Sequence, residues 1–334
     1  MDAAGSSSPP EYLFAGNLVL DDLVFANGET RMAAPGGNSL YAAVGARIWG
    51  APVGLAAVVG EDWPDDYTRR LQEGGIHTAG LKRVTGETLR SWVLYEQDGF
   101  RRYVSRNREV IPLTPSPYSS IPPTPEEMAA FGRAAKQVHH RMSPRPEHLP
   151  PVCRRARALH LCPMPLDILR DWSRLPAAQK TADILPYPAA GNLDAPPLCD
   201  LLSRLDAFLP SQAEAEHLQP GYAPETLCRA LAQRGPAVVV IKEGGRGVVV
   251  YHRPDDHLQR IPPLPVRVVD PTGAGDAFCG GFAVGLARTG DPFRAACYGT
   301  VSASFVIQDF GALHALRVSP TEAEARLAEL TAPL

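Results

Sequence analysis

Short runs of apolar residues, each long enough for one buried strand, recur along the chain between segments with helical spacing. The clearest run is Val53–Val59, which follows a helical pattern of small and apolar residues over Leu40–Trp49, ending at Gly50. With an earlier strand expected at Tyr12–Phe14, the order strand, helix, strand favours a parallel sheet. Since there is no internal repeat and no second core is evident, the pattern predicts one large, doubly wound α/β domain, with a mostly parallel sheet between helices.

The second half of the chain also alternates short apolar runs with segments of helical spacing. Further buried strands are expected at Ala158–Cys162, around Ile184, at Ala207–Leu209 and at Ala237–Ile241, and a hairpin is expected from Gly247–His252 and His257–Ile261. Helices are expected at Glu126–Val138, Pro224–Gln233, Gly275–Arg288 and Pro292–Gln308. The proline-rich stretch Ile111–Pro125 is typical of a loop.

One segment differs from the rest in its pattern of residues. Thr85–Val104 alternates polar residues with aromatic or β-branched ones, and Asp98 and Gly99 form a two-residue hairpin signal. Because one face of this hairpin is only partly apolar, we expect it to lie over the main domain as a small β flap and not inside its core.

Composition narrows the function classes. Hydrophobic residues make up 45% of the 334 residues and charged residues 21%, the balance of a globular protein, and a net charge of −3 gives no reason to expect nucleic acid or an anionic membrane as a partner. No apolar run approaches the length that crosses a bilayer. Residues 1–10 predict a flexible tail and not a signal peptide. Six cysteines without a C-x-x-C pair predict a reducing, cytoplasmic setting.

Histidines could in principle form a metal cluster. His139 and His140, with His148 and His160 further along, are separated by proline-rich connections and have no helical i, i+4 spacing. We therefore do not expect a metal site there.

The segment Val268–Gly281 (VVDPTGAGDAFCGG) carries the most chemical information. An extended run ends at Asp270, the chain turns through Thr272–Gly275, and a helix of small residues begins at Asp276. Unpaired amides at a helix N-terminus favour a bound anion, and an aspartate there could accept a proton from an attacking alcohol. The alternative is that the aspartate only caps the helix and the glycines only form the turn. On chemistry alone the two interpretations are equal.

Other glycine motifs can be tested directly. The chain has neither G-x-x-x-x-G-K-[ST] nor G-x-G-x-x-G, which argues against a P-loop enzyme and weakens a dinucleotide-binding interpretation. It also lacks H-E-x-x-H and G-x-S-x-G, so the simplest zinc-protease and serine-hydrolase hypotheses fall away.

Two segments together resemble a known family. DPTGAGD followed by AFCGGF is similar to the C-terminal signature of the ribokinase-like (PfkB) carbohydrate kinases, and PGGNSLYAAVGARIWG with VGLAAVVGEDW resembles their first signature. The resemblance extends from about Tyr12 to Gly311 in the expected order. It implies an ATP- and Mg²⁺-dependent kinase that phosphorylates a hydroxyl group of a small sugar, polyol or nucleoside.

The resemblance also assigns roles at the phosphate end. Asp276 matches the catalytic base, and Gly273, Ala274 and Gly275 match the anion hole. Residues matching the nucleotide and ion sites are Lys242, Gly244, Gly247 and Thr272 for ATP, Glu214 for Mg²⁺ through water, and Asp270 for a monovalent cation such as K⁺. Without the resemblance, the glycines near Lys242 would indicate no more than a hairpin.

At the substrate end, Asp21 matches an aspartate that binds sugar hydroxyls, and Gly36, Gly37 and Asn38 match the substrate-side loop. A carboxylate suits this task because it accepts hydrogen bonds from two hydroxyls at once. The alternatives are a solvated strand end for Asp21 and a plain helix-entry turn for the glycines. The resemblance further implies a core of residues 11–22, 36–86 and 107–334, and a small β lid of residues 23–35 and 87–106.

Three positions depart from the family pattern. Ser211 stands where the N-x-x-E motif has asparagine, Tyr41 stands where ribokinases proper have asparagine, and Pro271 follows Asp270 where threonine or serine is common. Tyr41 and Trp92 could form a ring-stacking wall or belong to the core. Ser211 favours an alternative function, a metabolite-binding sensor without catalysis, and a transferase using another phosphorylated cosubstrate is a third. We expect a small polyhydroxy substrate and a monomer or homodimer.

Overall fold

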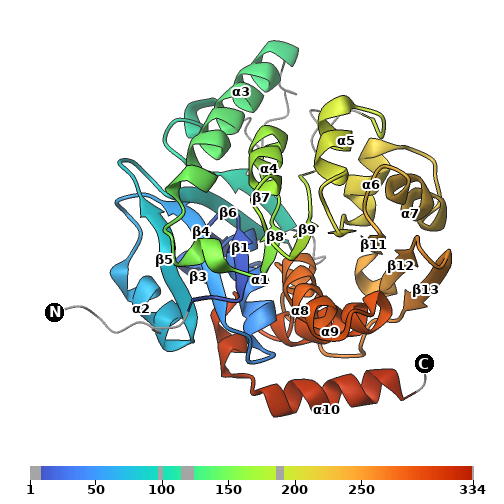
Figure 1. The fold of residues 1–334 in the computed structure, drawn as a ribbon. Helices are drawn as coiled ribbons and strands as arrows, with labels where there is room; N and C mark the ends of the chain where they lie inside the picture. Colours follow the sequence, from blue (N-terminus) through green and yellow to red (C-terminus); the bar gives the residue numbers. More distant parts are fainter. Residues whose placement is uncertain (1–8, 97–100, 114–123, 186–191, 333–334) are drawn as a thin grey trace.

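A nine-stranded sheet forms the centre of the molecule (Figure 1). The computed structural model describes residues 9–96, 101–113, 124–185 and 192–332. The strand order is β13-β12-β11-β10-β9-β8-β1-β4-β5, and the neighbours from β11 to β5 all pair in parallel. Only β12 and β13, at one edge, pair antiparallel. The predicted doubly wound, mostly parallel sheet is therefore confirmed.

The strands of this sheet are β1 (Tyr12–Ala15), β4 (Val53–Val59), β5 (Ile76–Arg83), β8 (Ala158–Leu161), β9 (Gln179–Ala182), β10 (Ala207–Phe208), β11 (Val238–Lys242), β12 (Val248–His252) and β13 (His257–Ile261). Most are short and buried on both sides, which is why they appear in the sequence as continuous apolar runs. The strand expected around Ile184 lies slightly earlier and ends at Ala182. Neither β5 nor the helix before it was expected.

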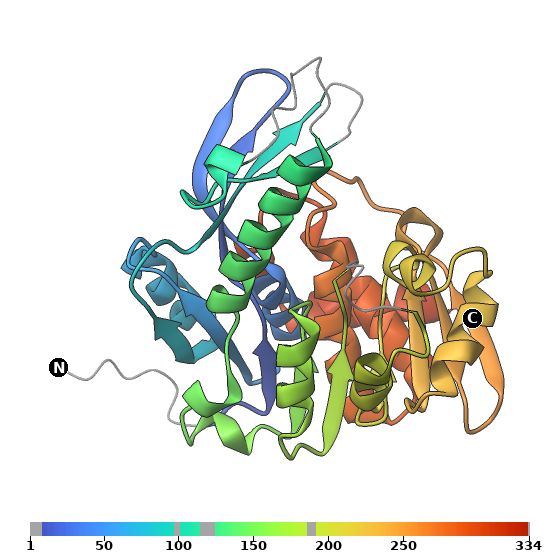
Figure 2. The same ribbon diagram turned by 90° about the horizontal axis from the view of Figure 1, so that it is seen from above.

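Helices cover both faces of the sheet, as Figures 1 and 2 show. One face packs against α1 (Asn38–Arg47), α8 (Ala274–Thr289), α9 (Pro292–Val306) and α10 (Pro320–Thr331). The other packs against α4 (Leu166–Ser173), α5 (Pro196–Leu202), α6 (Gln212–Leu218) and α7 (Pro224–Ala232). The remaining helices are α2 (Asp65–Glu73) and α3 (Pro125–Met142). No helix in the described ranges is both long and apolar enough to cross a membrane.

Small residues let α1 and α8 lie unusually close together. A Cβ atom added at Gly280 of α8 would overlap the backbone of Ala42, and one added at Gly45 of α1 would overlap the backbone of Ala277. The small residues expected in the helix after Asp276 are therefore needed for the close packing of α1 and α8. Since both helices start at the same edge of the sheet, their close contact brings two helix N-termini near each other.

A second, four-stranded sheet stands apart from the main body, at the top of Figure 2. Its strands are β2 (Val19–Val24), β3 (Thr30–Gly36), β6 (Leu89–Tyr95) and β7 (Arg101–Ser105), in the order β3-β2-β6-β7. The antiparallel pair β6 and β7 is the expected hairpin, although its turn at Asp98 and Gly99 lies outside the described residues. The first strand begins at Val19, before the expected lid boundary at residue 23.

Candidate active site

A cavity of about 780 Å³ opens where several parallel strands end. Asp183 directly follows β9, Ser211 lies shortly after β10, and Lys242 is the last residue of β11; all three line the cavity. The carboxyl edge of a parallel sheet is where α/β folds bind their ligands, because loops and helix N-termini converge there. The topology therefore places this cavity at the expected binding edge.

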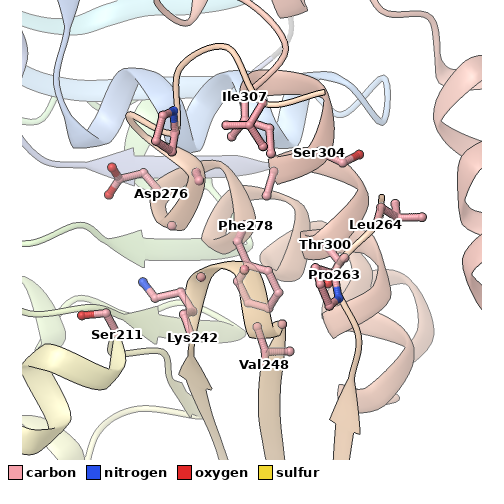
Figure 3. Close-up of a pocket in the computed structure, with 18 of the residues that line it drawn as sticks. Ser211, Lys242, Val248, Pro263, Leu264, Asp276, Phe278, Thr300, Ser304 and Ile307 are labelled. Carbon is pink, nitrogen blue, oxygen red and sulfur yellow. The ribbon is translucent and has the colours of Figure 1, made fainter. Parts of the chain in front are cut away.

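The cavity has a charged end and an apolar end (Figure 3). Asp276 and Lys242 lie at one end, and Pro263, Leu264 and Thr300 lie at the other, with Phe278 between them. Such a cavity suits a ligand that carries charge at one end and a flat apolar group at the other.

The turn into α8 is held in one conformation by its own contacts. Gly273 adopts a left-handed conformation with φ of 73°, which a glycine tolerates without strain. The backbone amide of Thr272 donates to Oδ1 of Asp270 at 2.9 Å, and the amide of Ala274 donates to the carbonyl of Pro271 at 3.3 Å. The ring of Tyr41 packs so closely on Gly273 that a Cβ atom there would overlap it. Tyr41 is therefore a core residue that supports the turn.

A backbone amide after this turn remains available to bind an anion. Gly275 lies in the first turn of α8, where a helical amide has no acceptor within the helix, and Gly275 lines the cavity. The dipole of the 16-residue helix adds a partial positive charge at the same place. Of the three residues predicted to form the anion hole, Ala274 already uses its amide in the turn, whereas Gly275 is placed to bind an anion.

Asp276 is half-buried and lines the cavity. Burial raises the pKa of its carboxyl group to about 7, the Lys242 ammonium opposes that rise, and the Glu214 carboxylate adds to it. A general base is most effective when its pKa is near the working pH, because it then ionises readily and still binds a proton firmly. The environment of Asp276 thus suits proton acceptance near neutrality.

Glu214 and Ser211 form a capping box at the start of α6. Ser211 Oγ accepts from the Glu214 amide at 3.3 Å, and Glu214 Oε2 accepts from the Ser211 amide at 2.5 Å. The serine therefore has a structural task as the helix cap. Three carboxylates, those of Asp183, Glu214 and Asp276, line the cavity, and Mg²⁺ prefers carboxylate and phosphate oxygens with several waters retained. Among the described residues, no three such side chains lie close enough together to hold a metal ion alone, so a divalent cation here would take further ligands from phosphate and water.

The residues predicted for substrate binding lie on β2, β3 and α1. Asp21 packs against Gly36, where a Cβ atom would overlap its carboxylate. Burial raises the pKa of Asp21 to about 7, and the negative charge of Asp270 adds to the rise. Asn38 braces the loop, because its Oδ1 accepts from the Asn17 amide at 2.8 Å and its Nδ2 donates to the Pro163 carbonyl at 2.7 Å. Asp21 and Asp270 thus form a second acidic region near the first one.

The apolar end consists of the extended segment between β13 and the α8 turn, together with one face of α9. Its lining residues are Pro263, Leu264, Pro265, Val266, Val268, Phe278, Ala303, Ser304 and Ile307. The Thr300 hydroxyl on α9 is buried here and, among the described residues, has no hydrogen-bond partner. A buried hydroxyl without a partner is costly, and Thr300 lines the cavity, so a ligand there is a candidate partner.

Eight of the fourteen predicted site residues line this cavity: Asn38, Glu214, Lys242, Gly244, Gly247, Ala274, Gly275 and Asp276. The six others, Asp21, Gly36, Gly37, Asp270, Thr272 and Gly273, lie around it, in the adjoining loops and in the turn before α8. The sequence analysis missed Asp183 and the apolar lining. Asp183 could have been found, because a polar residue directly after a buried strand lies at the binding edge of a parallel sheet.

Comparison with known proteins gives consistent results. The model of the pfkB family carbohydrate kinase matches residues 149–318. A cytidine kinase of Thermococcus kodakarensis is 29% identical over 282 residues, which cover 82% of this chain and 87% of the relative. A ribokinase of Lactococcus lactis is 32% identical over 134 residues, or 39% of this chain and 41% of the relative.

Solved structures share the fold. The nucleoside kinase of Burkholderia thailandensis in complex with inosine has a TM-score of 0.69 at 15% identity, covering 96% of this chain and 98% of that chain. The Arabidopsis thaliana ribokinase with ribose and ATP has a TM-score of 0.68 at 18% identity, covering 96% and 99%. A ribokinase-like structure from E. coli that contains ATP and Mg²⁺ has a TM-score of 0.70 at 20% identity, covering 96% and 99%.

Proposed function

Because this chain belongs to the pfkB family of carbohydrate kinases, we propose that it transfers the γ-phosphoryl group of ATP to a hydroxyl group of a small sugar, polyol or nucleoside. The observation that carries the proposal is the cavity itself. It combines a half-buried carboxylate at a helix N-terminus, Asp276, with an apolar end that suits a nucleobase. ATP has the matching shape, since its triphosphate and its base lie at opposite ends.

Asp276 acts as the general base in this proposal. Its carboxylate accepts the proton of the substrate hydroxyl as the oxygen attacks the γ-phosphorus, and the bond to the β-phosphate oxygen breaks. The Gly275 amide and the dipole of α8 stabilise the charge on the transferring group, because both lie at the start of α8, which borders the cavity. Gly273 and Ala274 hold the turn that aims this amide.

Mg²⁺ would lie at the acidic side of the cavity, with Glu214 holding it through water. A bound Mg²⁺ would supply positive charge that offsets part of the charge of the phosphate oxygens. The capping box fixes the Glu214 side chain, so that its carboxylate is presented by a rigid helix start. A monovalent cation such as K⁺ near Asp270 stays a prediction, which comparison of turnover in K⁺ and Na⁺ would test.

The substrate would bind between Asp21 and Asp276, under the small sheet. Asp21 accepts hydrogen bonds from substrate hydroxyls, and the backbone at Gly36 and Gly37 can approach the ligand closely. Gly37 has φ of 105° and no room for a Cβ atom against Asn17 and Leu18, so glycine is needed for this loop. The four-stranded sheet acts as a lid that excludes water from the reaction.

The decisive experiment is ATP consumption measured against a panel of pentoses, hexoses, inositols, cytidine and other nucleosides. We expect consumption with at least one acceptor and a phosphorylated product. The Asp276→Asn variant should lose about 10²- to 10⁴-fold in kcat, because the base is removed, while it still binds ATP. Wild-type protein that binds panel members yet phosphorylates none would instead support the sensor. Unchanged turnover of Asp276→Asn would show that another group is the base.

A further inference from the structure

Lys242 differs from the other charged residues of the cavity. Among the described residues that line it, Lys242 is the one cation beside three carboxylates, Asp183, Glu214 and Asp276. Its side chain is buried, and its ammonium forms an ion pair with Asp183 and contacts Cys279 Sγ at 3.5 Å. Burying a charge is costly, so a buried lysine at a ligand-binding edge calls for an explanation.

Three elements fix the position of this ammonium. Lys242 ends β11, and its backbone amide donates to the Pro210 carbonyl at 3.0 Å. Asp183 follows β9 in the same sheet, and Cys279 comes from α8. Burial lowers the pKa of Lys242, but Asp183, Cys279 and Glu214 together outweigh burial and hold that pKa well above its usual value. The cation is therefore permanent and rigidly placed.

The ammonium lies directly beside the proposed anion site. A Cβ atom built on Gly275 would lie 3.4 Å from Lys242 Nζ and 3.8 Å from Cδ and Cε. The backbone of Gly275 and the lysine cation thus border the same point, and the cation lies at the charged end of the cavity with Asp276 (Figure 3). A triphosphate entering this end would meet three carboxylates, so a fixed cation there has a large effect on its binding and reaction.

We propose that Lys242 is a catalytic residue, whose ammonium donates hydrogen bonds to the oxygens of the γ-phosphoryl group during transfer, and that Asp183 is its positioning residue. This inference rests on the proposed function. In the step, the substrate oxygen bonds to the γ-phosphorus, the bond from that phosphorus to the β-phosphate oxygen breaks, ADP leaves and Asp276 takes the proton. Lys242 stays protonated throughout and transfers no proton.

The first test is Lys242→Met, which keeps the side-chain volume and removes the charge. With the best acceptor, kcat should fall about 10²- to 10³-fold, as it does when one fixed donor is removed from a charged transition state. The KM for the acceptor should stay within about twofold. If Lys242 had only a structural role, the folded variant would lose little kcat.

Removing one partner of a buried ion pair destabilises a fold, so a second variant keeps the test decisive. The double variant Lys242→Met with Asp183→Leu removes both charges, and such replacements are often neutral for stability. It should fold and show the same loss of kcat. Asp183→Asn should lose less than Lys242→Met, because the cation remains but is less well held. Full activity in the double variant would overturn the inference.

Lys180→Met is the matched control. Lys180 lies on β9, is half-buried and donates to the Ser173 carbonyl at 3.0 Å, but it lies toward the other end of the strand from Asp183. It should keep wild-type kcat.

A binding measurement separates this inference from the proposed function. Lys242→Met should weaken binding of a nonhydrolysable ATP analogue at least about tenfold and leave the affinity for adenosine unchanged. If wild-type protein phosphorylates nothing, the proposed function fails, and this binding comparison still decides the role of Lys242. Equal affinity of wild type and variant for the ATP analogue would overturn that role, whatever the acceptor panel shows.

Discussion

The carboxyl group of Asp276 is harder to ionise in the folded protein than in the unfolded chain, and this suits its proposed role as a base. Burial raises the pKa of its carboxyl group to about 7 from an ordinary value of 3.8. A raised pKa means that the folded protein binds the proton more tightly than the unfolded chain does. The contribution to stability is therefore complete below about pH 4 and is lost as the pH rises through 7.

This shift predicts a pH-dependent effect of Asp276→Asn on stability. Asparagine does not titrate, so the variant should gain free energy of unfolding relative to wild type as the pH rises, by about 2 to 3 kcal/mol between pH 5 and pH 8. Urea unfolding of both ligand-free proteins at the two pH values measures the gain. Asp21 titrates in both proteins and cancels. An equal difference at both pH values would contradict the raised pKa of Asp276.

Thr300 gives a second prediction at the scale of one residue. Its hydroxyl is buried at the apolar end of the cavity without a described partner, so we expect it to hydrogen-bond the nucleobase of ATP. Thr300→Val keeps the shape and removes the hydrogen bond. It should raise the KM for ATP about 5- to 20-fold and change kcat little. Thr300→Ser should restore binding; a valine variant with wild-type KM would rule out the contact.

At the scale of elements, the contact between α1 and α8 positions the proposed anion site. Gly280→Ala would push a methyl group into the backbone of Ala42, because the two helices already touch there. We expect a loss of stability of about 1 to 3 kcal/mol and a lower kcat, since the start of α8 moves. Thermal unfolding and steady-state kinetics measure both effects.

Gly132→Ala is the control for this substitution. Gly132 lies inside α3, has no positive φ, and a Cβ atom there meets no atom within 4 Å. Alanine should stabilise the helix by about 0.5 to 1 kcal/mol without changing activity. If both alanine variants behaved alike, close packing of α1 on α8 would not explain the glycines of α8.

For the whole molecule, the important contact is between the small sheet and the main body. Phe25 and Tyr95, from the small sheet, contact Phe310, which follows α9, with ring centroids 4.6 Å and 5.8 Å apart. The guanidinium of Arg31 lies 4.9 Å from the centroid of the Phe310 ring. Tyr67 of α2 adds a hydrogen bond to the Ala33 carbonyl at 2.9 Å.

Phe310→Ala should weaken closure of the proposed lid. We expect a higher KM for the acceptor, by about 5- to 20-fold, together with increased ATP hydrolysis to water, because water reaches the transferring group. The ratio of ATP consumed to product formed measures this uncoupling. Phe310→Tyr, which keeps the ring, should behave as wild type. A ratio that stays at one in the alanine variant would show that Phe310 does not control water access.

Much of this molecule could be predicted from local sequence. The apolar runs and helical patterns gave the parallel α/β architecture because they reflect which face of each element is buried. The α8 turn was predictable for a similar reason, since Asp270, Gly273 and Asp276 form a local structure within seven residues. The role of Asp276 as a base is still a prediction, although its burial supports that role.

The tertiary structure decided the contacts between residues far apart in the chain, which local sequence patterns do not show. Lys242 and Asp183 are 59 residues apart and meet only because β9 and β11 flank β10 in one sheet. Thr300 borders the cavity because α9 packs beside α8, and Phe310, which follows α9, meets Phe25 at the end of β2. Hydrophobic periodicity shows which face of an element is buried but not which neighbour covers it. The sequence alone therefore determines most of the elements and the turn before α8, whereas strand order and helix packing determine which charges surround that turn.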